Sequence, residues 1–379
     1  MARNEYTGAG SIVEVKNILD EHRPKKIFFV TGKSSYKKSG AQSIINKVLK
    51  NYKNVHYNDF NVNPKFEDLK NGISLFKKNN CDFVIAVGGG STIDIAKSVN
   101  LFASNPSFPI DYIQKKKNIE KKGSTLVAIP TTAGSGSEAT KFAVIYTEKI
   151  KSSIEHDFIL PDYSIVDPEF TMSSPRYVTA CAGMDALSQG IESYWCINST
   201  EESKKYARES IKLAFKNLPQ AVNEPSREIR ESMAKAAHLA GKAINISKTT
   251  ACHSISYPIT SYFNVPHGHA VALTLALMII YNSQATEKDV LDERGMNYVN
   301  STISEIVELL GADNAEDAAN KIINLMREIG LRTRLSELGI NKDEEVELII
   351  KRGFNPDRVN NNPRMLTEFA LREILYKIR

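Results

Sequence analysis

The chain has 379 residues, of which 42% are hydrophobic and 25% charged, and its formal net charge is +5. This composition is typical of a folded globular protein and excludes a disordered one, and the length suffices for two domains. The lysines are scattered along the sequence and do not form a basic stripe, which argues against nucleic acid as a partner. No segment approaches the roughly 20 apolar residues of a membrane span.

The cysteines lack the spacing of a metal finger or a redox CxxC motif. They are Cys81, Cys181, Cys196 and Cys252. Isolated cysteines in a chain of this size indicate reduced core residues. Because the N-terminus also has no apolar signal core, we expect a cytoplasmic protein.

The first ~175 residues alternate short apolar runs with amphipathic stretches. The apolar runs predict strands over 26–30, 55–60, 82–87 and 126–129, and the amphipathic stretches predict helices over 41–52 and 92–101. Strand–helix alternation at this spacing predicts a mostly parallel sheet with helices on both faces.

From about Pro175 onward the strand signal disappears. Helical patterns cover 203–218, 228–246, 270–281 and 298–310. We therefore predict an α/β, Rossmann-like dinucleotide-binding domain over residues 1–177 and an all-helical domain over residues 178–379.

A glycine-rich turn marks the expected nucleotide site. Gly88, Gly89 and Gly90 follow a buried strand, and Ser91 opens the next helix. Glycines let backbone amides approach a pyrophosphate, and a helix N-terminus carries positive partial charge. The same residues also fit a simple turn capped by Ser91, with Asp94 completing a near-capping box, and both interpretations can hold together.

Two further loops follow predicted strands. Residues 131–138 offer the hydroxyls of Thr131, Thr132 and Ser135 at the carboxyl end of a strand, where open α/β sheets bind ligands. Gly32, Lys33 and Ser34 follow the first strand, where an acid would hold the 2′-hydroxyl of NAD. Because this loop has a lysine and no acid, it predicts NADP(H) in preference to NAD(H).

The helical half contains candidate ligands for a divalent metal. Asp185 and Gln189 are four residues apart, so a helix places both on one face. His253 and His267 are 14 residues apart, which would span about 21 Å on one straight helix. A break at a proline between them, Pro258 or Pro266, would fold the second histidine back toward the first.

In these residues the chain resembles the iron-containing alcohol dehydrogenases over nearly its whole length. The stretches that carry the resemblance are 88–97, 129–138, 183–187 and 266–268. The resemblance implies a dinucleotide-binding domain followed by a helical metal-binding domain, an architecture shared with dehydroquinate synthase. It also implies a nicotinamide cofactor, a homodimer and the reversible oxidation of a small alcohol.

By this resemblance Asp185, Gln189, His253 and His267 occupy the positions of the four metal ligands, for Fe²⁺ or Zn²⁺. The family usually has a histidine where this chain has Gln189, and an amide oxygen is a weaker ligand. Lys151 corresponds to a lysine near the cofactor ribose.

Tyr257 stands where the family has a histidine near the nicotinamide. One turn after His253 on a continuing helix, its phenol would face the same site and donate a proton to an alkoxide. The alternative is a half-buried aromatic with a structural role. Tyr257 and His267 are thus the candidate catalytic residues.

Within the family the chain is most similar to phosphonoacetaldehyde reductases, in residues 30–40, 191–195, 253–258 and 265–270. This similarity implies NADPH-dependent reduction of phosphonoacetaldehyde to 2-hydroxyethylphosphonate, in phosphonate biosynthesis. Three alternatives remain open: a reductase of other short or anionic aldehydes, a lyase or cyclase on the same scaffold, and a nucleotide-binding relative without metal.

Overall fold

A computed structural model of the chain describes residues 4–148 and 150–379. The chain divides into two compact units between Ser174 and Pro175. The boundary predicted from the sequence, after residue 177, lies in the first turn of a helix that begins at Arg176. Pro175 precedes that helix and suits its start, because proline cannot donate an amide hydrogen bond and its fixed φ does not interrupt a first turn.

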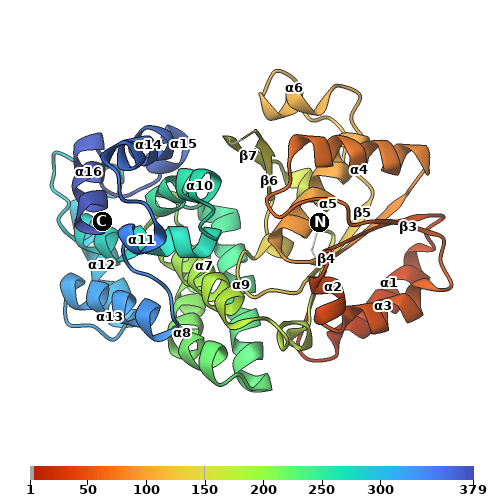
Figure 1. The fold of residues 1–379 in the computed structure, drawn as a ribbon, viewed down its shortest axis with the longest axis horizontal. Coiled ribbons are helices and arrows are strands. Elements are labelled where there is room, and N and C mark those ends of the chain that lie inside the picture. Colours follow the sequence, from red (N-terminus) through yellow and green to blue (C-terminus); the bar gives the residue numbers. More distant parts are fainter. Residues whose placement is uncertain (1–3, 149) are drawn as a thin grey trace. The chain divides into compact units, whose positions relative to one another are not determined.

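The first unit is built on a six-stranded, all-parallel sheet in the order β1-β8-β5-β4-β2-β3 (Figure 1). The strands are β1 (Asn4–Thr7), β2 (Ile27–Thr31), β3 (Asn54–Tyr57), β4 (Phe83–Gly88), β5 (Thr125–Pro130) and β8 (Tyr163–Val166). The helices are α1 (Glu14–His22), α2 (Ser35–Lys38), α3 (Ala41–Leu49), α4 (Phe66–Lys78), α5 (Gly90–Ala103) and α6 (Pro109–Ile113). The predicted α/β fold with a parallel sheet is confirmed.

Alternate residues of the central strands supply two hydrophobic cores, one on each face of the sheet. One core contains Phe28, Val84 and Leu126 and packs against α4 and α5. The other contains Phe29, Ile85 and Val127 and packs against α1 and α3. Figure 1 shows these two pairs of helices on opposite faces of the sheet.

Four strands were not predicted. β1 and β8 are short, and β6 (Phe142–Thr147) and β7 (Ile150–Glu155) form an antiparallel hairpin beside the parallel sheet. In β7 only Ile154 is buried, so this strand lacks the continuous apolar run of the central ones. Its place in the fold depends on pairing with β6 rather than on its own hydrophobicity.

The second unit is helical. Its helices are α7 (Arg176–Trp195), α8 (Glu201–Asn223), α9 (Arg227–Ser247), α10 (Ala251–Phe263), α11 (His267–Ser283), α12 (Met296–Leu309), α13 (Ala315–Glu328), α14 (Asp343–Gly353), α15 (Pro356–Val359) and α16 (Glu368–Lys377). The predicted helical patterns all lie within these helices or within one residue of their ends. Among the described residues, none of the helices has the length and apolar character that crossing a membrane requires.

The break between the two metal-ligand candidates is not at Pro258, which lies inside α10. α10 ends instead at Phe263, where the C-cap Asn264 has a left-handed φ of 57°, and α11 begins at His267 directly after Pro266. A proline at helix position 8 removes one hydrogen bond but leaves the first turns intact. The left-handed Asn264 reverses the chain, and Pro266 then restarts a helix.

Candidate functional site

The long helix α7 carries Asp185 and Gln189 into the interior of the second unit. It is buried over nearly its whole length after Val178, so polar side chains there lie in the protein core. The side chains of Asp185 and Gln189 are on one face, and their exposed fractions are only 6% and 3%. Polar groups this deeply buried need partners, which α10 and α11 provide.

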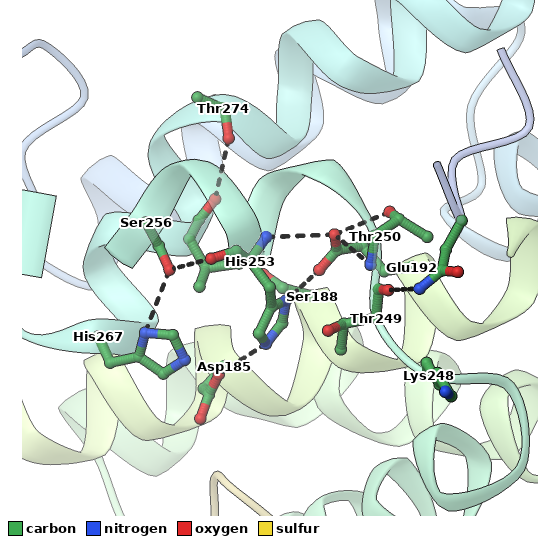
Figure 2. Close-up of polar contacts among 12 residues, drawn as sticks. Asp185, Ser188, Glu192, Lys248, Thr249, Thr250, His253, Ser256, His267 and Thr274 are labelled. Carbon is green, nitrogen blue, oxygen red and sulfur yellow. Dashed lines mark hydrogen bonds and ion pairs between the residues drawn. The ribbon is translucent and has the colours of Figure 1, made fainter. Parts of the chain in front are cut away.

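Asp185, His253 and His267 come together as the sequence predicted. Their candidate ligand atoms all lie within 4.8 Å of one another (Figure 2). His253 Nε2 lies 3.5 Å from Asp185 Oδ1, and the two imidazole rings are 5.3 Å apart and nearly perpendicular. One carboxylate and two imidazoles converging in this way suit Fe²⁺ or Zn²⁺.

Glu192 fixes the ring of His253 from the side away from Asp185. The Glu192 carboxylate is fully buried and contacts His253 Nδ1. It also accepts hydrogen bonds from Thr250 N at 3.1 Å, Thr250 Oγ1 at 2.8 Å and His253 N at 3.3 Å. Because a carboxylate only accepts hydrogen bonds, Nδ1 carries the proton and the lone pair of Nε2 is directed at the cluster.

Ser256 fixes the ring of His267 in a similar way. The Ser256 hydroxyl donates its proton to His253 O at 2.6 Å, so it accepts from His267 Nδ1 at 3.2 Å. His267 Nε2 is then the nitrogen with a lone pair. Both histidines are thus held in the tautomer that a metal ligand requires.

Without a metal, the His253 imidazole of the cluster retains a second proton. Burial lowers the pKa of His253, but the carboxylates of Glu192 and Asp185 outweigh it and raise the pKa to about 9. The imidazolium is stable there because it lies between two negative groups. A divalent cation bound at Nε2 would replace this proton and satisfy the same carboxylates.

Gln189 fits the same cation site. Within the described part of the chain, the buried Gln189 Oε1 has no hydrogen-bond partner. An amide oxygen buried without a partner costs free energy unless a donor or a cation reaches it. Gln189 lies one helical turn from Asp185, so its oxygen is a suitable fourth ligand, and the donor set present here fits a divalent metal.

Close packing of α11 on α7 depends on Gly268. A methyl group at this position would lie 2.0 Å from Cys181 O and 2.8 Å from Asp185 Cβ. Only glycine lets the first turn of α11 approach α7 so closely. His267, the preceding residue, is brought beside Asp185 by this contact.

Tyr257 lies on the continuous helix α10, one turn after His253. Its ring centroid is 6.3 Å from that of His267, and the tyrosine is partly buried. The structure therefore places Tyr257 beside the cluster, on the side of His267.

In the first unit, the glycine turn lies between β4 and α5. The helix begins at Gly90 with Gly89 as N-cap, so the predicted capping role of Ser91 is wrong. Ser91 Oγ instead accepts from Asn63 N at 3.1 Å. Gly89, whose backbone is extended with φ −74° and ψ −177°, caps the helix two residues before the predicted cap, Ser91.

The loop after β5 packs against this glycine turn. A methyl group on Gly89 would lie 3.3 Å from Thr132 Oγ1, and one on Gly90 would lie 2.7 Å from Ser135 Oγ. Thr131 N donates to Gly88 O at 3.0 Å, which joins the two loops at the carboxyl ends of adjacent strands. The predicted cofactor residues of these two loops therefore lie next to one another.

Asp94 has an internal role in place of the expected capping box. Its carboxylate accepts from Ser137 Oγ at 2.6 Å and from Val144 N at 3.0 Å, which ties α5 to the hairpin. Burial raises the pKa of the Asp94 carboxyl, and the positive charges of Lys97 and Lys151 oppose that rise. Lys151, expected near the cofactor ribose, thus lies on β7 within electrostatic reach of Asp94.

The loop after β2 contains Gly32, Lys33 and Ser34 at the same edge of the sheet. Lys33 Nζ lies 3.3 Å from Asp59 Oδ1, and both side chains are largely exposed. Asp59, in the segment after β3, therefore places a carboxylate beside this loop. An exposed pair of this kind is weak and easily exchanged for a ligand phosphate.

The roles of Glu192, Ser256 and Gly268 were not predicted from the sequence. Glu192 follows Asp185 by seven residues and Gln189 by three, so the spacing alone places it on the same face of α7. A third polar side chain at helical spacing from Asp185 and Gln189 is a usable signal. Ser256 had no such signal, because its role depends on where α11 returns.

Comparison with known proteins identifies the family. Residues 3–168 match the model of the iron-containing alcohol dehydrogenases, and residues 179–378 match the C-terminal model of the Fe-containing alcohol dehydrogenase family. The chain is 32% identical to the NAD-dependent methanol dehydrogenase of Bacillus methanolicus, over 97% of this chain and 96% of that protein. It is 31% identical to the phosphonoacetaldehyde reductase of Streptomyces viridochromogenes, over 78% and 75%.

Among solved structures, sulfoacetaldehyde reductase from Bifidobacterium kashiwanohense in complex with NAD⁺ superposes with a TM-score of 0.88. That protein is 32% identical, and the match covers 99% of this chain and 96% of the other. The chain therefore belongs to the iron-containing alcohol dehydrogenase family and is an oxidoreductase that acts on alcohols or aldehydes.

Proposed function

We propose that this enzyme reduces a short anionic aldehyde to a primary alcohol with NADPH, and that phosphonoacetaldehyde is its substrate. The observation that carries the proposal is the pair of oriented histidines converging with Asp185. Two similar proteins act on two-carbon aldehydes with an anionic group, the phosphonoacetaldehyde and sulfoacetaldehyde reductases. A methanol dehydrogenase is equally similar, so the family relationship alone does not select the substrate.

In this proposal Asp185, Gln189, His253 and His267 hold Fe²⁺ or Zn²⁺. When bound, the metal supplies a Lewis acid that polarises the aldehyde oxygen, and the nicotinamide supplies the hydride. Glu192 keeps His253 in its ligating tautomer. Tyr257 donates a proton to the alkoxide from its position beside His267, and His267 helps to orient the substrate oxygen.

The cofactor is held by the loops of the first unit. The backbone amides of Gly89 and Gly90 bind the pyrophosphate, and the hydroxyls of Thr132 and Ser135 line the same surface. Lys33 binds the 2′-phosphate of NADPH after exchanging its exposed carboxylate partner. We also expect a homodimer, which light scattering on the purified protein will test.

The experiment measures the metal content and the turnover of the same preparation. NADPH and NADH oxidation are followed with phosphonoacetaldehyde, sulfoacetaldehyde and propanal, before and after chelation and after addition of Fe²⁺ or Zn²⁺. We expect chelator-sensitive turnover that is fastest with NADPH and phosphonoacetaldehyde. Absence of turnover with every aldehyde in metal-loaded protein would refute the proposed reaction.

A matched variant tests the cofactor assignment. Lys33→Ala should raise KM for NADPH and leave KM for NADH unchanged, because only NADPH has the 2′-phosphate. Lys47→Ala, a change at an exposed lysine in the last turn of α3, serves as the charge-matched control. An equal effect of Lys33→Ala on both cofactors would overturn the NADPH preference.

A further inference from the structure

A lysine in the middle of α5 is completely buried. The exposed fraction of Lys97 is 0%, although its ammonium group carries a charge. Lys97 Nζ donates to Ser137 O at 2.5 Å, Thr140 O at 2.7 Å and Phe142 O at 2.8 Å. It also lies 3.1 Å from Ser137 Oγ and 3.2 Å from Thr140 Oγ1. A buried charge is stable only when hydrogen bonds replace its lost water, and one short segment, residues 137–142, supplies these bonds.

Residues 137–142 join the two segments of the first unit that we expect to contact the pyrophosphate and the ribose of the cofactor. The loop after β5, which carries Thr132 and Ser135, lies immediately before them. The hairpin of β6 and β7, which carries Lys151, begins at their last residue. Because Lys97 binds the carbonyl groups of the joining residues, a single ammonium group fixes both segments to α5.

The hairpin depends on such contacts for its position. β6 and β7 form a two-stranded sheet of their own, separate from the six-stranded sheet, and β6 lies beside α5 (Figure 1). Asp94, one turn before Lys97 on α5, accepts from Val144 N at 3.0 Å. Farther along β6, Tyr146 N donates to Pro64 O at 2.8 Å. Asp94 and Lys97 therefore hold the start of β6, and the segment before α4 holds its other end.

A chain of hydrogen bonds leads from Lys97 to the glycine turn. Ser137 Oγ donates to Asp94 Oδ1 at 2.6 Å and lies next to Lys97 Nζ. Ser137 N donates to Ser135 Oγ at 3.3 Å. Ser135 Oγ in turn lies 2.7 Å from the place of a methyl group on Gly90, the first residue of α5. An amide that donates to a hydroxyl oxygen leaves the hydroxyl proton for another acceptor, so Ser135 is suited to bind an anion at this helix N-terminus.

We propose that Lys97 is a positioning residue of the cofactor site, which holds Ser135 at the N-terminus of α5 and keeps the Lys151 hairpin beside that helix. Lys97 itself does not contact the cofactor, because its ammonium protons already have acceptors in residues 137–142. The inference rests on the proposed cofactor site and names the residue on which its geometry depends. A lysine that only added stability would not alter nucleotide affinity in a folded variant.

The test begins with Lys97→Met, which keeps the side-chain length but removes the donors. We expect Kd for NADPH, measured by fluorescence with the metal-loaded enzyme, to rise about 10- to 100-fold, the range for loss of charge-assisted hydrogen bonds. KM for NADPH should rise by the same factor, while kcat at saturating NADPH stays unchanged.

Lys204→Met is the matched control for loss of a buried ammonium group. Lys204 is 4% exposed, lies on α8 in the second unit and donates to Thr302 Oγ1 at 2.8 Å. This variant should unfold at a lower temperature than the wild type and bind NADPH with unchanged affinity. If both lysine variants weaken NADPH binding equally, the effect of Lys97 is general destabilisation and the inference is wrong.

A double-mutant cycle tests whether Lys97 acts through the loop. Ser135→Ala should raise Kd for NADPH about 10-fold in the wild type, because a hydrogen bond to an anion is lost. In Lys97→Met the same change should raise Kd less than about threefold, since the hydroxyl is no longer held in place. Equal factors in the two backgrounds would show that Lys97 and Ser135 act independently and would overturn the inference.

Ser137→Ala carries the same test if Lys97→Met does not fold. It removes only the hydroxyl between Asp94 and Lys97 and leaves the carbonyl acceptors in place. We expect Kd for NADPH to rise about threefold or more, and the effect of Ser135→Ala to shrink in this background as well. Unchanged NADPH affinity in folded Ser137→Ala would contradict the positioning role.

The same measurements separate this inference from the proposed cofactor site. If the wild type binds neither NADPH nor NADH, the cofactor site itself is refuted. If the wild type and Lys97→Met bind NADPH equally, only the role of Lys97 is refuted. Affinity for Zn²⁺, measured by competition with a chromophoric chelator, should be the same in both proteins, and a lower affinity in Lys97→Met would indicate a general loss of structure and contradict a local role.

Discussion

Replacing Glu192 with glutamine should reverse the proton position on His253. The Oε1 atom of Glu192 faces three donors, two from Thr250 and one from the His253 backbone, so the glutamine carbonyl will occupy this position. The new amide NH₂ then faces His253 Nδ1, which must give up its proton and accept. The proton moves to Nε2, where it blocks the lone pair that a metal needs.

The expected loss follows from that change. Replacing a group that orients a ligating histidine typically lowers metal affinity by about 10- to 100-fold, which corresponds to about 1.4 to 2.8 kcal/mol. The assay is competition between the metal-stripped protein and a chromophoric chelator for Zn²⁺, which does not depend on turnover. Nitrogen NMR of labelled histidine above pH 9, where His253 of the metal-free wild type is neutral, provides a second readout, since the shifts of Nδ1 and Nε2 should exchange.

The matched control is Glu305→Gln, which removes another carboxylate of the second unit. Glu305 lies on α12 and accepts from the Tyr194 hydroxyl, so this change should affect stability but not zinc binding. If Glu192→Gln binds zinc as tightly as the wild type, the hydrogen bond to Nδ1 does not control ligation by His253. The tautomer argument would then be wrong.

Three other predictions follow from the same geometry. Gln189→His should raise affinity for Zn²⁺, because imidazole is a better ligand than an amide oxygen, and an unchanged affinity in the chelator assay would remove Gln189 from the ligand set. Gly268→Ala should lower the free energy of unfolding by about 3 kcal/mol or more in urea titrations, since the alanine Cβ would lie 2.0 Å from Cys181 O. A loss of stability below about 1 kcal/mol would contradict that packing. The four cysteines are buried, and burial raises the pKa of Cys81 to about 11 and that of Cys181 to about 12. A thiol reagent at pH 8 should therefore label the native protein slowly and should label all four thiols after denaturation. Rapid labelling of the native protein would show that these sites open.

Local sequence patterns predicted the elements with strong patterns of their own. β4 and β5 were recognisable because they are buried on both faces and therefore form continuous apolar runs. β7, in which only Ile154 is buried, had no such run. The helix starts were less accurate, since α5 is capped by a glycine whose backbone angles the sequence does not specify.

The sequence by itself determined the family, the two-part organisation and the candidate metal ligands. Asp185 and Gln189 are linked by helical periodicity, and the histidines lie in short motifs that can be recognised without coordinates. Only the tertiary structure decided how those ligands are held. Glu192 meets His253 across 61 positions of sequence, and no local pattern specifies that contact.

The same distinction applies to Ser256. Ser256 orients His267 only because α11 folds back along α10 after Asn264. Side-chain identity thus supplied the chemical groups, while backbone angles and long-range packing set the direction of each proton and lone pair.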